Sequence, residues 1–172
     1  MSIVNSSTIG VNLGNSDGAT ALFGLGNTVN GSDGSQWLYV YATAAMVTGT
    51  VACYSTAYVA QPATASNLFG AVGAGSPNSG MGLAFAQGVF AAADYGWICI
   101  RGADQYVRVS SISTVGAALY LDTGSSGVLT TTAASGTMAG IILLTASSTG
   151  IQTAVRAYLQ YPRLSPGALF GV

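Results

Sequence analysis

Apolar and polar residues alternate in short runs along most of the chain, and Gly, Ser and Asp separate the runs. Alternation with a period of two places successive side chains on opposite faces of a strand, so Trp37, Tyr39 and Tyr41 share one face. The pattern predicts strands at 37–42, 50–54, 57–60, 81–86, 97–101, 106–110, 118–121, 140–144 and 154–159. No window carries the apolar stripe that a helix of about 11 or more residues would show. We therefore predict an all-β fold, a small barrel or sandwich of short antiparallel strands with extended N- and C-terminal arms.

The chain of 172 residues divides into three regions on this pattern. Residues 1–36 are rich in Ser, Asn and Gly, with SerAspGly turns at 16–18 and 32–34, and predict an extended N-terminal arm. Ordering such an arm costs about 1–2 kcal/mol per residue in backbone entropy, so we expect it to lie on a neighbouring subunit. Residues 37–161 form the predicted body. The remainder, 162–172, is a predicted tail whose prolines hold it extended and whose apolar end docks into a groove.

A weak internal repeat runs through the predicted body. Residues 46–54 align with 113–120, and this alignment matches Gly49 to Gly116. The repeat suggests that two similar units close one barrel, while chance similarity between β-hairpins is the competing explanation. The predicted duplication covers 46–101 and 113–160.

The chain contains very few ionisable side chains. There are four Arg and five Asp, no Lys, no Glu and no His, so 5% of residues are charged. An average domain is about 25% charged, and surface charge normally keeps copies apart. Either the protein has an unusually hydroxyl-rich surface, or neighbouring subunits of an assembly cover much of that surface.

The missing residue types also limit chemistry. Without His there is no Ser/His/Asp triad, and without Lys there is no P-loop lysine and no Schiff-base nucleophile. The only carboxylates in the body that an acid/base pair could use are Asp94, Asp104 and Asp122, and each lies beside Gly or in a turn. We therefore expect no enzyme activity, no cofactor and no metal. The basic residues are too few for the clustered footprint that nucleic acid requires.

Two further features bear on compartment and chemistry. Cys53 and Cys99 lie in apolar runs, which favours buried free thiols over a single disulfide. Residues 82–100 have about the length of a membrane span, but they contain Gln87 and Asp94. We predict two strands and a turn there, and no membrane contact.

Several motifs, in their order along the chain, resemble small capsid decoration (cement) proteins of tailed bacteriophages. The segments that carry the resemblance lie at 32–42, 90–102, 117–129, 138–143 and 157–163. The family implies an all-β virion protein, made in the host cytoplasm, that binds the major capsid protein on the outer head surface. It also implies a homo-oligomer, with a trimer favoured over a dimer, and arms that reach neighbouring subunits.

Aromatic residues and Arg dominate interface energetics, which selects candidate anchors for such contacts. The candidates are Phe23, Trp37, Tyr161, Arg163, Leu169 and Phe170. The competing interpretation of Trp37 is a core residue, and that of Tyr161 and Arg163 is a simple strand end. Two other functions fit the same sequence: a tail or fibre component, or a carbohydrate-binding attachment module. The second would stack sugars on Tyr39, Tyr41, Tyr54 and Tyr58.

Overall fold

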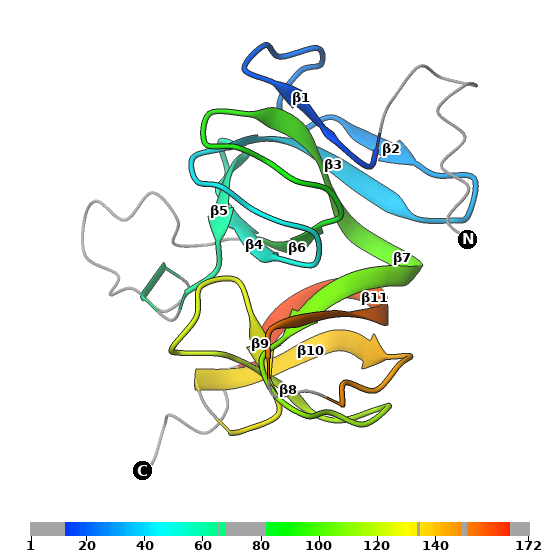
Figure 1. The fold of residues 1–172 in the computed structure, drawn as a ribbon. Helices are drawn as coiled ribbons and strands as arrows, with labels where there is room; N and C mark the ends of the chain where they lie inside the picture. Colours follow the sequence, from blue (N-terminus) through cyan, green and yellow to red (C-terminus); the bar gives the residue numbers. More distant parts are fainter. Residues whose placement is uncertain (1–12, 65, 68–81, 134, 149–150, 166–172) are drawn as a thin grey trace.

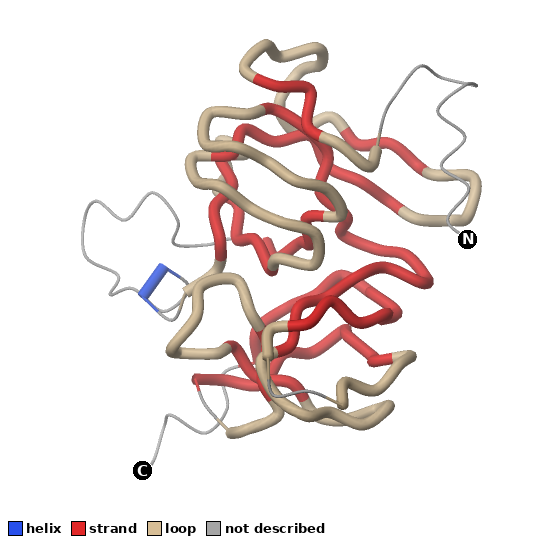
Figure 2. The backbone as a smooth tube through the Cα atoms, viewed as in Figure 1, coloured by secondary structure: helices blue, strands red, loops and turns tan. Residues whose placement is uncertain are grey.

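The computed structural model describes residues 13–64, 66–67, 82–133, 135–148 and 151–165. The fold is all-β, with a small closed barrel of five strands and additional strands, which confirms the predicted fold class. Apart from a short helical turn at 66–67, strands and loops make up the described chain (Figure 2). The strands are β1 (Ser16–Gly18), β2 (Thr28–Asn30), β3 (Gln36–Ala42), β4 (Val51–Tyr54), β5 (Val59–Pro62), β6 (Gly82–Ala86), β7 (Tyr95–Val109), β8 (Leu119–Leu121), β9 (Leu129–Thr130), β10 (Ser135–Leu143) and β11 (Thr153–Ser165).

Strand pairing closes the sheet into two rings that share β7. The first ring runs from β7 through β6, β4, β5 and β3 back to β7. The second runs from β7 through β9, β8, β10 and β11 back to β7. In Figure 1 the first ring lies in the upper half and the second in the lower half, and β7 descends from one to the other.

The two rings have the same strand order and the same pairings. In each ring the first strand in the chain pairs with the third in parallel: β3 with β5, and β7 with β9. The other pairings in both rings are antiparallel. The prediction of antiparallel strands alone therefore missed one parallel pair in each ring. The matched units run from β3 to β7 and from β7 to β11; that they arose by duplication stays a prediction.

The two rings differ in what fills them. One core cluster draws on all five strands of the first ring and is rich in small side chains: Ala42, Ala52, Ala60, Ala84 and Ala86, with Leu38, Val40 and Ile98. Alanine thus supplies half of the buried residues of this cluster. The other cluster fills the second ring with larger residues and continues over the outer face of the first ring, where it includes Trp37, Tyr39 and Phe85.

The N-terminal segment covers that outer face. β1 pairs with β7, and β2 pairs with β3. The ring of Phe23 lies 5.3 Å, centroid to centroid, from those of both Tyr39 and Trp97. The prediction of an arm ordered only by a neighbouring subunit is therefore wrong for residues 13–36, because they pack on their own chain. Residues 1–12 lie outside the described residues.

One buried hydroxyl fastens this segment. Tyr39 is 0% exposed, and its hydroxyl donates to Asp17 Oδ2 at 2.8 Å while accepting from the Leu22 amide at 3.0 Å. Burial, together with the Asp17 carboxylate, raises the pKa of Tyr39. The hydroxyl thus satisfies two polar groups of the segment at the surface of the core.

Two predicted boundaries are corrected. The strand expected at 97–101 and all but the last residue of the one expected at 106–110 belong to β7, which is 15 residues long. Residues between them form a bulge, where Asp104 adopts a φ of 64° in place of a turn. The tail expected from residue 162 also begins too early, because β11 continues to Ser165 and pairs with β10 there. Pro162 is tolerated because it lies in a second bulge, where no ladder hydrogen bond needs its missing N–H.

The apolar stretch 82–100 consists of β6, a loop and the start of β7, as predicted. In the part of the chain that the structure describes, no helix is long and apolar enough to cross a membrane.

Candidate interaction surface

The five aspartates of the chain all lie in described regions, and each accepts a hydrogen bond from its own chain. The donors are Tyr39 Oη on Asp17, Ser35 N and Oγ on Asp33, Ser16 Oγ and Ala91 N on Asp94, Arg156 on Asp104, and Gly124 N on Asp122. These contacts hold turns, bulges and segment crossings in place. Within the described ranges, no group of three or more His, Cys, Asp or Glu side chains could hold a metal ion.

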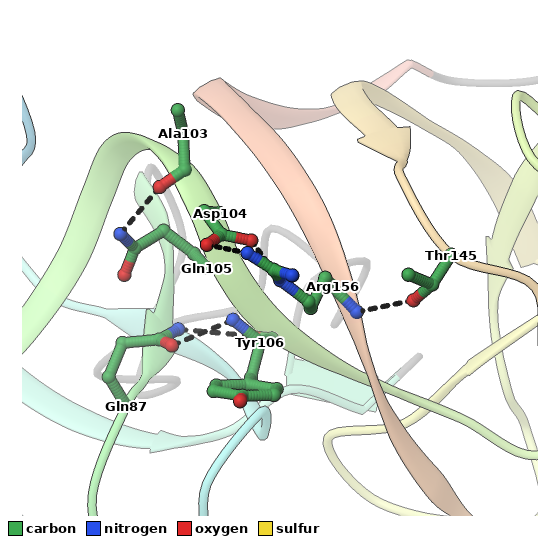
Figure 3. Close-up of polar contacts among 7 residues, drawn as sticks. All are labelled: Gln87, Ala103, Asp104, Gln105, Tyr106, Thr145 and Arg156. Atoms are coloured by element: carbon green, nitrogen blue, oxygen red, sulfur yellow. Dashed lines mark hydrogen bonds and ion pairs between the residues drawn. The ribbon is translucent and has the colours of Figure 1, made fainter. Parts of the chain in front are cut away.

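A cluster of polar side chains braces the bulge of β7 (Figure 3). Arg156 on β11 binds both carboxylate oxygens of Asp104, through Nε and one terminal nitrogen. Beside it, Gln87 makes two hydrogen bonds with the Tyr106 backbone, at 3.0 Å to the carbonyl and 2.8 Å from the amide. The Arg156 amide donates to Thr145 Oγ1 at 3.0 Å. The cluster joins β7, β11 and two loops, which is a structural task.

The two cysteines are buried free thiols. Cys53 on β4 lies opposite Leu83, and Cys99 on β7 lies opposite Phe85, so β6 separates them. Two strand spacings amount to about 9–10 Å, beyond the reach of a disulfide. Burial raises the pKa of Cys53 to about 11 and that of Cys99 to about 12, so both remain protonated and unreactive at neutral pH.

The predicted anchors separate into buried and exposed residues. Trp37 is 2% exposed and its indole N–H donates to Ser35 Oγ at 2.7 Å, so the prediction of an exposed anchor is wrong and the core interpretation holds. Phe23 is half-buried between core rings, which also removes it as a free anchor. Tyr161 is 52% exposed, and Arg163 is exposed. Leu169 and Phe170 lie outside the described residues.

The proposed sugar-stacking face does not form. Tyr39 is fully buried under the N-terminal segment. Tyr54 and Tyr58 pack against the alanine-rich cluster inside the first ring, whereas Tyr39 belongs to the other cluster. The four tyrosines therefore do not share one exposed face.

Exposed aliphatic residues gather on corresponding loops of the two rings. In the first ring, loops 43–50 and 87–94 are clamped by a reciprocal pair of backbone hydrogen bonds between Met46 and Phe90. In the second, Ser113 and Ser147 make the same clamp between the β7–β8 and β10–β11 loops. We call these the two loop pairs. Their exposed aliphatics are Val47 (42%), Val89 (63%), Ile112 (66%), Val115 (62%), Leu144 (45%) and Ile151 (75%).

A second exposed feature, the Tyr161 patch, comprises Gln36, Arg101, Gln160, Tyr161 and Arg163. Its strands meet in register, because Arg101 on β7 lies opposite both Gln36 on β3 and Gln160 on β11. The Tyr161 hydroxyl donates to Gln36 Oε1 at 2.8 Å, and the Arg101 guanidinium lies 5.8 Å from the centre of the Tyr161 ring. Sequence alone selected Tyr161 and Arg163 by residue type, but it missed Arg101, which is far away along the chain.

Comparison of the sequence with known protein families and with curated proteins gives no match to either.

Proposed function

We propose that this protein is a capsid decoration protein, which binds the outer surface of a bacteriophage head and stabilises the shell by bridging major capsid subunits. The observation that carries the proposal is the repeated display of aliphatic side chains on the two loop pairs. A shell lattice repeats the same subunit surface, so a protein with two similar rings suits contact with two similar sites.

The energetics favour this use of the loop pairs. Burying an exposed Val or Ile stabilises a contact by about 1.5–3 kcal/mol, which corresponds to about tenfold or more in affinity. Two such contacts on one molecule act together, because after the first contact forms the second is effectively intramolecular. The scarcity of charge supports the same use, since few charged groups must be desolvated when the surface is covered.

The test is co-sedimentation of the purified protein with phage heads that lack it, followed by measurement of the temperature at which the heads rupture. Bound protein should raise the rupture temperature. The variants Val89→Ser and Ile151→Ser should each bind about tenfold or more weakly than wild type, because each removes one of the two contacts of a bivalent interaction. Leu22→Ser is the matched control, since Leu22 is 64% exposed but lies outside both loop pairs.

Absence of binding to heads would refute the proposal. Binding confined to tails would instead identify a tail component, which is the second structural role expected from the sequence.

A further inference from the structure

The Tyr161 patch carries an inference about partner chemistry. We infer that this patch is a preformed recognition site for a carboxylate-bearing surface of another protein. The inference deepens the proposed function and rests on it for the identity of that protein, the shell subunit.

The backbone at Tyr161 is held in an unfavourable conformation. Its φ is 47°, in the left-handed region that non-glycine residues rarely adopt. The cause is a bulge: between Leu159 and Arg163, β11 has three residues where β10 has only Gly140. Gly140 is required there, because a Cβ atom on it would lie 2.5 Å from the Gln160 carbonyl oxygen. Bulges of this kind redirect side chains, and strain kept at an exposed residue suggests a function for that residue.

The redirected side chain is held in place before any partner arrives. Gln36 fixes the hydroxyl of Tyr161, and the Arg101 guanidinium packs over its ring. Gln36 lies on β3 and Arg101 on β7, so the Tyr161 ring is tied to two strands other than its own. A half-exposed tyrosine with restricted freedom loses little entropy on binding, which is typical of an interface anchor.

The patch also contains positive charge without a carboxylate partner. Among the described residues Arg156 pairs with Asp104, whereas Arg101 and Arg163 have no ion pair. Arg101 and Arg163 are both exposed; Arg101 lies over the Tyr161 ring, and Arg163 follows Tyr161 by two residues on β11. Two exposed arginines without an ion pair are complementary to carboxylates, which guanidinium groups bind in a bidentate manner. They are too few to follow a phosphate backbone.

We assign the complementary carboxylates to a different protein. All five aspartates of this chain already accept hydrogen bonds within it, and the chain has no glutamate. A second copy is therefore a poor source of acidic side chains, because each of its five carboxylates already holds a turn, a bulge or a segment crossing in place. The major capsid subunit is the partner that the proposed function offers.

The decisive variant is Tyr161→Gly. The substitution removes the aromatic ring and relieves the strain of the left-handed backbone. A structural role and a recognition role for Tyr161 therefore predict different results. Recognition predicts at least about tenfold weaker binding to heads with a melting temperature unchanged or raised. A structural role predicts a lower melting temperature and binding by the folded variant as tight as wild type, and that result would overturn the inference.

Charge is tested separately, with Arg101→Gln and Arg163→Gln measured at 50 and 200 mM salt. Each should weaken binding by about fivefold or more and reduce its salt dependence, while Arg108→Gln, outside the patch, should stay within about twofold of wild type. Should an arginine variant prove unfolded, the matching Lys variant retains the charge and the stem and should lose the bidentate contact alone.

The partner is tested by neutralising the carboxylates on the heads with carbodiimide and glycinamide. Treated heads that still sediment as intact particles should lose binding of the wild-type protein. Unchanged binding to treated heads, equal binding by the patch variants, or an effect of those variants on self-association alone would each overturn the inference while leaving the proposed function intact. Failure of wild-type protein to bind untreated heads would refute both.

Discussion

Gly49 and Gly116 occupy the same turn in the two rings and offer a matched pair of substitutions. Their φ values are 83° and 73°, and each lies three residues after its clamp residue, Met46 or Ser113. They differ in surroundings. A Cβ atom at Gly49 would lie 2.9 Å from the Arg108 backbone nitrogen, whereas one at Gly116 would meet nothing within 4 Å.

The two alanine variants should therefore differ in stability. Placing an L-residue in the left-handed region destabilises the folded state by about 1–2 kcal/mol. The lower conformational entropy of the unfolded variant offsets about 0.4–1 kcal/mol of this loss. Gly116→Ala should thus lower the free energy of unfolding by at most about 1.6 kcal/mol, with a central value of about 0.8 kcal/mol. Gly49→Ala must also displace the β7 backbone, which adds about 1–3 kcal/mol.

Urea unfolding and thermal melting measure the difference. At about 2–4 °C per kcal/mol for a chain of this size, Gly116→Ala should melt a few degrees lower and Gly49→Ala lower still. Gly34→Ala is a control in an unrelated turn, because Gly34 has a φ of 78° and open space at its Cβ position. Equal destabilisation by the two ring variants would refute the claim that close approach to β7, and not φ alone, requires Gly49.

Three other predictions follow from buried and paired groups. At pH 8 neither Cys53 nor Cys99 should react with a thiol reagent in the native protein, while both should react in guanidinium. Folding raises the pKa of these thiols from 9.0 to about 11 and about 12. Their contribution to the free energy of unfolding is therefore present below pH 9 and is lost as the pH rises toward those values. Rapid native labelling would contradict the buried placement. Tyr39→Phe should lower the free energy of unfolding by about 1–3 kcal/mol, measured in urea, because it leaves the Asp17 carboxylate and a backbone amide without this partner; a loss below about 0.5 kcal/mol would show that the hydroxyl does not fasten the N-terminal segment. Asp104→Asn should cost only about 0–1 kcal/mol, because its ion pair is partly exposed and Asn tolerates a positive φ; a loss above about 2 kcal/mol would contradict this.

Local alternation in the sequence was enough to predict the fold class and most strands, because a half-buried strand repeats every two residues. It missed β9, which is only two residues long and whose parallel pairing with β7 is set by contacts distant in sequence. It also divided β7 at 102–104, since GlyAlaAsp resembles a turn. In the structure Asp104 takes the left-handed conformation of a bulge and the strand continues.

Burial of individual aromatic residues was the least predictable feature. Trp37 and Tyr161 are both aromatic residues near the ends of predicted strands, yet one is 2% and the other 52% exposed. The N-terminal segment covers the outer face of the first ring, and this cover buries Trp37. The residues around Phe23 show no regular alternation of apolar and polar side chains, so the sequence did not predict this contact. Tyr161 is turned outward by a bulge opposite Gly140, which depends on the register between β10 and β11.

Closure of the two rings has a consequence for behaviour at high concentration. Proteins with a net charge as small as −1 repel one another weakly, and an unpaired strand then becomes a template on which further chains add. Here the described strands of each ring form backbone hydrogen bonds with one another. The strand at the end of the pairing order, β2, is only three residues long and offers little edge for pairing. We therefore expect crowded copies to meet through side chains of this described part of the chain, in an association that is reversible and does not propagate as a fibril.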